Sequence, residues 1–272
     1  MLDYIQIVFE NITTAQQELL VANLSEEGYE GFEEGEDSLK AFITKNNFDK
    51  TIIDSIASQY AVVYTTAEIP SQNWNAVWES NFEPVIVDDF VSVIAHFHQP
   101  VKRVEHEILI TPKMSFGTGH HATTYMMMRQ MRNINFKNQN VFDFGTGTGV
   151  LAILADKLGA NKILAIDNDE WSIENAMENA ERNACKNITI QKGDSAKTGE
   201  QFGIVLANIN KNVILENFSV LVKSLLPGGV LLLSGLLAED KEDILNEAEK
   251  YNLMVKKEEL LNNWLCLNLS EK

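Results

Sequence analysis

The sequence predicts an α/β chain of two domains: a small α+β domain at residues 1–66 and a larger α/β domain at 85–272, joined by a linker at 67–84. Three observations predict this organisation. Strand-like and helix-like segments follow the order βαββαβ over the first 66 residues. Beyond residue 85, apolar runs of strand length alternate with stretches of helix length. One of those runs leads into a turn with three glycines at alternate positions. Alternating elements imply a mostly parallel sheet covered on both faces, with ligands at the carboxyl ends of its strands.

The small domain has the element order of a ferredoxin-like sandwich. Its apolar periodicity and capping residues predict each element separately. The expected elements are a strand at 4–9, a helix from Thr13 or Thr14 to Gly28, a hairpin over 29–44, a helix at 51–60 and a strand at 61–65.

The small domain is strongly acidic, with 12 acidic residues against three basic ones and a net charge of −9. Two interpretations remain open. The charge is either a solubilising surface or a docking face for a basic macromolecule, which would make residues 1–66 a substrate-recognition domain.

The linker contains Trp74 and Trp78, four residues apart, which predict a short helix packed on a domain through its two rings. His96 and His98 share one face of a predicted strand at 85–97. No third ligand of suitable spacing accompanies them, and the adjacent pair His120 and His121 lacks a partner cysteine or carboxylate, so no metal site is predicted.

A strand at 107–111 precedes a loop rich in glycine and hydroxyl residues, Pro112 to Thr124. We expect part of this loop, Phe116 to Thr124, to form a flap over a ligand, with Gly117 and Gly119 permitting closure. Four methionines in the following helix pattern, 125–131, are interpreted as gap-filling core side chains.

The glycine turn is the most informative stretch of the chain. An apolar strand pattern ends at Asp143, three glycines follow at Gly145, Gly147 and Gly149, and an Ala-rich helix pattern spans 151–158. Glycine lets a backbone approach a ligand closely and adopt positive φ, and a helix N-terminus offers unpaired N–H groups.

A second strand pattern, 162–166, ends at Asp167, which lies 22 residues after Gly145. An acid in this position can accept hydrogen bonds from both hydroxyls of a ribose, so the paired features predict a nucleoside-containing cofactor.

Two cofactors compete for this pattern. A nicotinamide fingerprint can be placed on Gly147, Gly149 and Ala152, but it leaves Asp143 and Gly145 unexplained. Asp-x-Gly-x-Gly-x-Gly from Asp143 instead resembles motif I of the class I S-adenosylmethionine (SAM) methyltransferases. SAM has no pyrophosphate for a neighbouring carboxylate to repel, which favours a class I, Rossmann-like SAM-dependent methyltransferase domain.

The remaining pattern continues the alternation of strands and helices. A strand at 188–190 ends near Asp194, and a strand at 203–207 delivers Asn208 to the carboxyl edge of the sheet. The other expected elements are helices at 170–183, 212–226 (ending at Pro227-Gly228-Gly229) and 239–251, a strand at 230–234, and a strand pair at 254–260 and 264–269.

Three segments together carry a more specific resemblance. Phe-Gly-Thr-Gly-His-His-x-Thr-Thr at 116–124, Asp-Phe-Gly-Thr-Gly-Thr-Gly-Val-Leu-Ala-Ile at 143–153 and Leu-Ala-Asn-Ile at 206–209 resemble the ribosomal protein L-eleven methyltransferases (PrmA-type). The resemblance covers essentially the whole chain and implies methylation of lysine and N-terminal amino groups of that basic protein. It further implies that Asn208 lies where cofactor and substrate meet. The residues expected to contact SAM are Phe116, Gly117, Thr118, Thr124, Gly145, Gly147, Asp167, Asp194 (at the adenine) and Asn208.

The composition indicates which kind of partner the chain binds and in which cellular compartment it works. The net charge of −17 and a pI of about 4.7 disfavour direct binding of nucleic acid phosphates and suit a basic protein partner. Two distant cysteines, an N-terminus without a basic leader pattern and the absence of a membrane-length apolar run favour the reducing cytoplasm, and we expect a monomer. Two other functions stay open: a class I methyltransferase acting on another protein or on RNA, and a non-catalytic acidic adaptor.

Overall fold

The computed structural model describes residues 3–69, 82–113 and 115–272. The chain divides between Asn81 and Phe82 into two compact units, which are described separately. The predicted linker helix with Trp74 and Trp78 lies outside the described residues. No helix among the described residues combines the length and apolar character needed to cross a bilayer.

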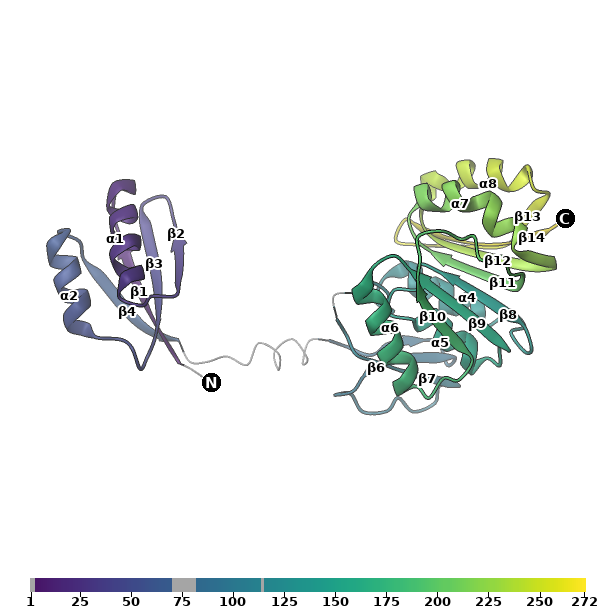
Figure 1. Ribbon diagram of the computed structural model, residues 1–272, viewed down its shortest axis with the longest axis horizontal. Coiled ribbons are helices and arrows are strands. Elements are labelled where there is room, and N and C mark those ends of the chain that lie inside the picture. Colours follow the sequence, from purple (N-terminus) through teal and green to yellow (C-terminus); the bar gives the residue numbers. More distant parts are fainter. Residues whose placement is uncertain (1–2, 70–81, 114) are drawn as a thin grey trace. The chain divides into compact units, whose positions relative to one another are not determined.

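The first unit has the predicted βαββαβ order (Figure 1). Its antiparallel sheet has the order β2-β3-β1-β4, with both crossover helices packed on it, which is the ferredoxin-like arrangement. The elements are β1 (Tyr4–Glu10), α1 (Thr14–Glu26), β2 (Gly31–Glu34), β3 (Ser38–Thr44), α2 (Lys50–Gln59) and β4 (Tyr64–Ile69).

Local sequence accounts for the element boundaries of this unit. Thr13 and Gln16 form a reciprocal capping box at the start of α1, and the Asp49 side chain caps α2. The last strand starts at Tyr64, later than the predicted 61, because Ala61 ends the helix in the left-handed region at φ 52°.

The second unit is built on a seven-stranded sheet of order β10-β9-β8-β11-β12-β14-β13. The first five strands are parallel, and the hairpin of β13 and β14 adds two antiparallel strands at one edge. A separate three-stranded sheet, β5-β6-β7, precedes it. The strands are β5 (Val85–Val87), β6 (Val91–Ala95), β7 (His106–Ile110), β8 (Asn140–Phe144), β9 (Lys162–Asp167), β10 (Ile188–Lys192), β11 (Phe202–Asn208), β12 (Leu225–Leu237), β13 (Leu253–Leu261) and β14 (Trp264–Glu271).

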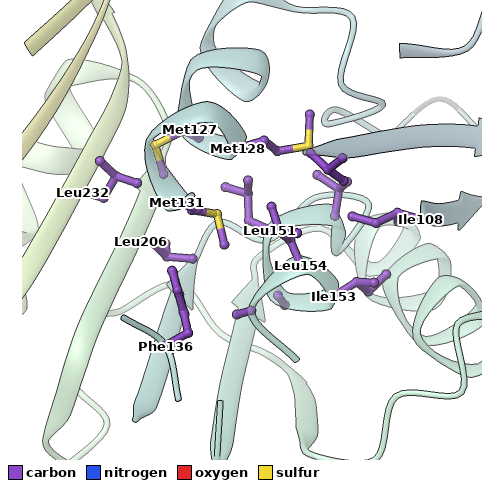
Figure 2. Close-up of a cluster of buried hydrophobic side chains, with 14 of the residues drawn as sticks. Ile108, Met127, Met128, Met131, Phe136, Leu151, Ile153, Leu154, Leu206 and Leu232 are labelled. Atoms are coloured by element: carbon purple, nitrogen blue, oxygen red, sulfur yellow. The ribbon is translucent and has the colours of Figure 1, made fainter. Parts of the chain in front are cut away.

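Helices cover both faces of the large sheet, as the alternating pattern predicted (Figure 1). The described α-helices of this unit are α4 (Ala122–Met131), α5 (Val150–Lys157), α6 (Glu170–Arg182), α7 (Lys211–Lys223) and α8 (Lys241–Glu249). Side chains of α4 and α5 share one core cluster, whereas those of α7 and α8 belong to the cluster on the other face. The methionines of α4 lie fully buried among aliphatic side chains such as Leu206 and Leu232 (Figure 2), so their prediction as core residues is confirmed.

Three further predicted boundaries, all in the second unit, were wrong. Helix α7 ends at Lys223, because Leu225 already pairs with Phe202 and the Pro-Gly-Gly sequence forms an irregularity inside β12. A 3-10 turn at Ala238–Asp240 precedes α8, since the Asp240 carboxylate accepts the Leu237 N–H at 2.7 Å.

The third difference affects the predicted flap. Helix α4 begins at Ala122, with His121 as its N-cap residue, so Thr124 lies in the first helical turn and is buried. The loop therefore ends before Thr124.

Candidate active site

The strand ends β8, β9 and β11 meet at a cavity of about 450 Å³, a typical size for a small-molecule site. It lies at the carboxyl ends of parallel strands, where ligands bind in open α/β sheets. Six of the predicted contact residues line it: Phe116, Gly145, Gly147, Asp167, Asp194 and Asn208. Three others, Gly117, Thr118 and Thr124, are not part of that lining, and their contacts with a cofactor stay predictions.

The glycine turn between β8 and α5 uses left-handed backbone at each of its three glycines, with φ of 78°, 54° and 81°. A Cβ on Gly145 would collide with the Ile209 side chain, and one on Gly147 with the Phe116 carbonyl oxygen. The sequence predicted glycines that let a cofactor approach. The structure shows that protein neighbours also occupy the space that a side chain would need.

Asp167 ends β9 and its carboxylate is fixed on both oxygens. Oδ2 accepts the Gly147 N–H at 2.8 Å, and Oδ1 accepts the Asp169 N–H at 3.0 Å. Each carboxylate oxygen has about two acceptor sites, so both retain one for a ribose hydroxyl. Asp167 thus binds the backbone of the glycine turn and can at the same time accept hydrogen bonds from the ribose.

Asp143 lies under the glycine turn, fully buried. Its Oδ2 accepts a hydrogen bond from the Thr146 hydroxyl at 2.6 Å, whereas Oδ1 has no partner among the described residues. Burial raises the pKa of Asp143 to about 7; the Thr146 hydrogen bond opposes this, and the charge of Asp167 adds to it. The Asp143 carboxyl is therefore a buried structural group that becomes protonated as the pH falls below about 7.

Asn208 ends β11 at the cavity and is almost completely buried. Its Nδ2 donates to the Thr124 hydroxyl at 3.1 Å, and its Oδ1 has no hydrogen-bond partner among the described residues. A buried amide oxygen without a partner is costly and indicates a missing donor. Thr124 therefore lies behind Asn208 and fixes which atom of the amide faces that donor.

Thr118, one of the predicted contact residues, does not line the cavity, and neither do His98 and His120, which were considered as metal ligands. The Thr118 hydroxyl lies 3.0 Å from His120 Nδ1, and His120 Nε2 lies 2.9 Å from the Glu83 carbonyl oxygen. The His98 ring contacts the backbone at Ala95 and Phe82. Within the described residues, no cluster of three or more His, Cys, Asp or Glu side chains is arranged to hold a metal ion.

The lining residues that sequence reasoning missed include the aromatic pair His121 and Trp264. Their ring centroids lie 4.6 Å apart, and Phe116 lies 5.2 Å from His121. His121 belongs to the conspicuous His pair and could have been found. Trp264 reaches the cavity because antiparallel β14 starts at the carboxyl edge of the sheet, which no local pattern announces.

The sheet order, the glycine turn after β8 and the acid at the end of β9 define a methyltransferase fold of class I. The family model for ribosomal protein L11 methyltransferase (PrmA) matches residues 5–272, and the chain belongs to this family.

Relatives and one solved structure agree with this assignment. The ribosomal protein L11 methyltransferase of Bacteroides fragilis is 36% identical over 274 residues, covering 97% of this chain and 98% of the relative. That of Chlorobaculum tepidum is 40% identical, covering 88% and 86% respectively. The crystal structure of the ribosomal protein L11 methylase from Lactobacillus delbrueckii subsp. bulgaricus is 28% identical with a TM-score of 0.66, covering 70% of this chain and all of that one.

Proposed function

We propose that this chain transfers methyl groups from SAM to amino groups of ribosomal protein L11, at lysine side chains and the N-terminal amine. The observation that carries the proposal is the buried, unpartnered Oδ1 of Asn208 at a cavity that also presents the Asp167 carboxylate. The names of the relatives support the identity of the substrate.

The residues present fit SAM. Asp167 offers one free acceptor site on each carboxylate oxygen for the ribose hydroxyls, and Asp194 lines the cavity where we expect the adenine. The turn at Gly145 and Gly147 brings backbone against the same cavity. When bound, SAM would supply a methyl group on a positively charged sulfur; the substrate amine would attack the methyl carbon in line, and the sulfur would leave as a neutral thioether.

Asn208 orients the nucleophile. Its Oδ1 accepts an N–H of the substrate amine, and this bond aims the nitrogen lone pair at the methyl group. The hydrogen bond from Nδ2 to Thr124 prevents the amide from rotating and presenting its NH₂ group instead. Orientation of this kind lowers the barrier without a change of charge on the enzyme.

The amine must be neutral to react. A lysine has an ordinary pKa near 10.4 and an α-amine one of about 7.7–8.0, so both lose a proton to solvent before or during reaction. The leaving group is already activated, and a dedicated protein base is not required. Rates should therefore rise with pH as the substrate amines deprotonate.

Residues 1–66 recognise the substrate in this proposal. Their net charge of −9 complements a basic ribosomal protein, and exposed acids gather on the hairpin and the end of α1, as in Glu26, Glu27, Glu34 and Glu36. The chain between Ile69, where β4 ends, and residue 85 links this domain to the catalytic domain at 85–272. We expect the protein to act as a monomer in the cytoplasm, where ribosomal proteins are made.

Transfer of tritiated methyl groups to a total ribosomal fraction tests the proposal. Label should appear in the protein fraction, in the L11 band, and only with the chain present. Label in RNA or in other proteins would instead identify a different class I methyltransferase. Binding of L11 without any transfer would identify an adaptor.

A further inference from the structure

Thr148, between the second and third glycines of the turn, is engaged with a segment 31 residues earlier in the chain. Its N–H donates to the Phe116 carbonyl oxygen at 3.0 Å, and its hydroxyl donates to the Gly117 carbonyl oxygen at 2.7 Å. Thr148 is fully buried, so neither donor has solvent as an alternative. Two adjacent carbonyls are thus bound by one residue of the turn.

The two backbones approach closely, with the Thr148 hydroxyl bridging between them. A Cβ on Gly147 would collide with the Phe116 carbonyl oxygen, and one on Gly117 would lie 2.9 Å from the Thr148 hydroxyl oxygen. Both glycines also adopt positive φ. These glycines therefore serve the docking of one segment on the other, in addition to any contact with a ligand.

Asn179 of α6 extends this contact to the other end of the segment. Its Nδ2 donates to the Thr148 carbonyl oxygen at 2.9 Å, and its Oδ1 accepts the Thr111 N–H at 2.8 Å. Thr111 directly follows β7 and begins the loop that leads to Phe116. One buried amide consequently joins the start of the loop to the turn on which the loop docks.

Asn179 is the middle member of an asparagine ladder on α6, completed by Asn175 and Asn183. Asn175 Nδ2 donates to the Thr111 carbonyl oxygen at 3.0 Å, and Asn183 binds both the N–H and the carbonyl oxygen of Leu109, at 3.0 and 2.7 Å. Four helical residues rise about 6 Å, close to the roughly 6.6 Å of two strand residues. The ladder therefore supplies the edge of β7 with hydrogen bonds that a neighbouring strand would supply.

These bonds position a wall of the cavity. Phe116 lines the cavity and is about half exposed, so apart from its contact with the His121 ring the side chain has little packing to hold it. The backbone of Phe116 and Gly117 is held by Thr148, and Thr148 by Asn179.

We propose that Thr148 and Asn179 are positioning residues that hold Phe116 over the cavity and so determine how slowly bound SAM leaves. The proposal rests on the proposed function, because it requires SAM to occupy this cavity. It assigns to the Thr148 hydroxyl a role in retention of the cofactor, with the methyl-transfer step itself unaffected.

The test compares two substitutions of Thr148 in the full chain. Thr148→Val keeps the shape and the backbone N–H but removes the hydroxyl donor, whereas Thr148→Ser keeps the donor. Release of tritiated SAM is followed after addition of excess unlabelled SAM. Thr148→Val should release SAM about five- to tenfold faster, the effect expected for one lost hydrogen bond, and Thr148→Ser should stay within twofold of the parent. Under saturating SAM, kcat of Thr148→Val should change by less than twofold.

A double substitution shows whether Thr148 acts through Phe116. In a Phe116→Ala chain the wall is absent, so adding Thr148→Val should change SAM release by less than twofold. An undiminished effect in that background would overturn the proposal, as would a Thr148→Val chain that releases SAM at the parental rate.

A second pair of variants covers the case in which Thr148→Val does not fold. Asn179→Ala and Asn183→Ala each remove one member of the ladder, but only Asn179 contacts Thr148. Asn179→Ala should accelerate SAM release at least fivefold, and Asn183→Ala less than twofold, at comparable losses of thermal stability. Equal acceleration by both would mean that the ladder acts through stability alone and would overturn the proposal. A parent chain that fails to bind SAM would sink the proposed function instead.

Discussion

The role of Asp167 can be tested by replacing its carboxylate. Both of its oxygens already accept one backbone N–H, so each has one site left for a ribose hydroxyl. A hydrogen bond to a charged group is worth about 1.5–3 kcal/mol, and 1.4 kcal/mol corresponds to a factor of ten. Asp167→Ala should weaken SAM binding by about 100-fold through two lost bonds, and Asp167→Asn by about tenfold through one.

Asp169 provides a matched control. It lies two residues after Asp167, at the N-cap of α6, where its carboxylate accepts the Ser172 N–H at 2.9 Å, and it does not line the cavity. Asp169→Ala should therefore lower thermal stability and leave SAM affinity within about threefold. Titration calorimetry measures all three variants. Parental affinity in a folded Asp167→Ala chain, an equal loss in Asp169→Ala, or a parent chain that prefers NADH to SAM would refute the assignment.

Three further predictions concern the reacting amine, the buried acid and the small domain. Asn208→Ala should lower kcat by about 10- to 100-fold with a smaller change in SAM affinity, measured by single-turnover methylation, because the lost hydrogen bond orients the nucleophile. In the folded chain the pKa of Asp143 is about 7, whereas its ordinary value is 3.8. Between these two pH values the folded state therefore keeps a proton that the unfolded state has lost. The free energy of unfolding falls as pH rises through this range and is level above it. Asp143→Asn cannot ionise and should gain about 2 kcal/mol relative to the parent between about pH 5.5 and about pH 8, measured by urea unfolding. A fragment beginning at Phe82 should bind SAM but not methylate L11, and full-length turnover should fall as added salt screens the acidic domain.

Each of these has an outcome that contradicts it. Parental kcat in Asn208→Ala would remove Asn208 from the reaction. An Asp143→Asn chain whose stability follows pH in parallel with the parent would show that Asp143 titrates normally. Equal turnover by the fragment and the full chain on L11, at low and high salt, would make residues 1–66 a solubilising domain.

Much of the cavity was predictable because its residues follow strand ends in a local pattern. The glycine turn after β8 and the acid at the end of β9 are separated by one helix, so their spacing alone predicts that they meet at the sheet edge. Asn208 was found in the same way, at the end of β11.

The rest depended on contacts between distant segments. Nothing near Trp264 indicates that an antiparallel hairpin returns it to the carboxyl edge, and nothing near Gly147 indicates that the Phe116 carbonyl fills the space beside it. The predicted end of α7 failed for a related reason. Proline and glycine usually end a helix, but here pairing of Leu225 with Phe202 places them inside a strand.

We propose that this chain methylates amino groups of ribosomal protein L11 with SAM bound at the described cavity. The decisive experiment is peptide mass spectrometry of purified L11 that has been incubated with SAM and either the parent or Asp167→Ala. We predict methyl groups on lysine or N-terminal amines with the parent, and far fewer with Asp167→Ala at a SAM concentration near the parental Kd. Unmodified L11 after incubation with a parent chain that binds SAM would show that L11 is not its substrate.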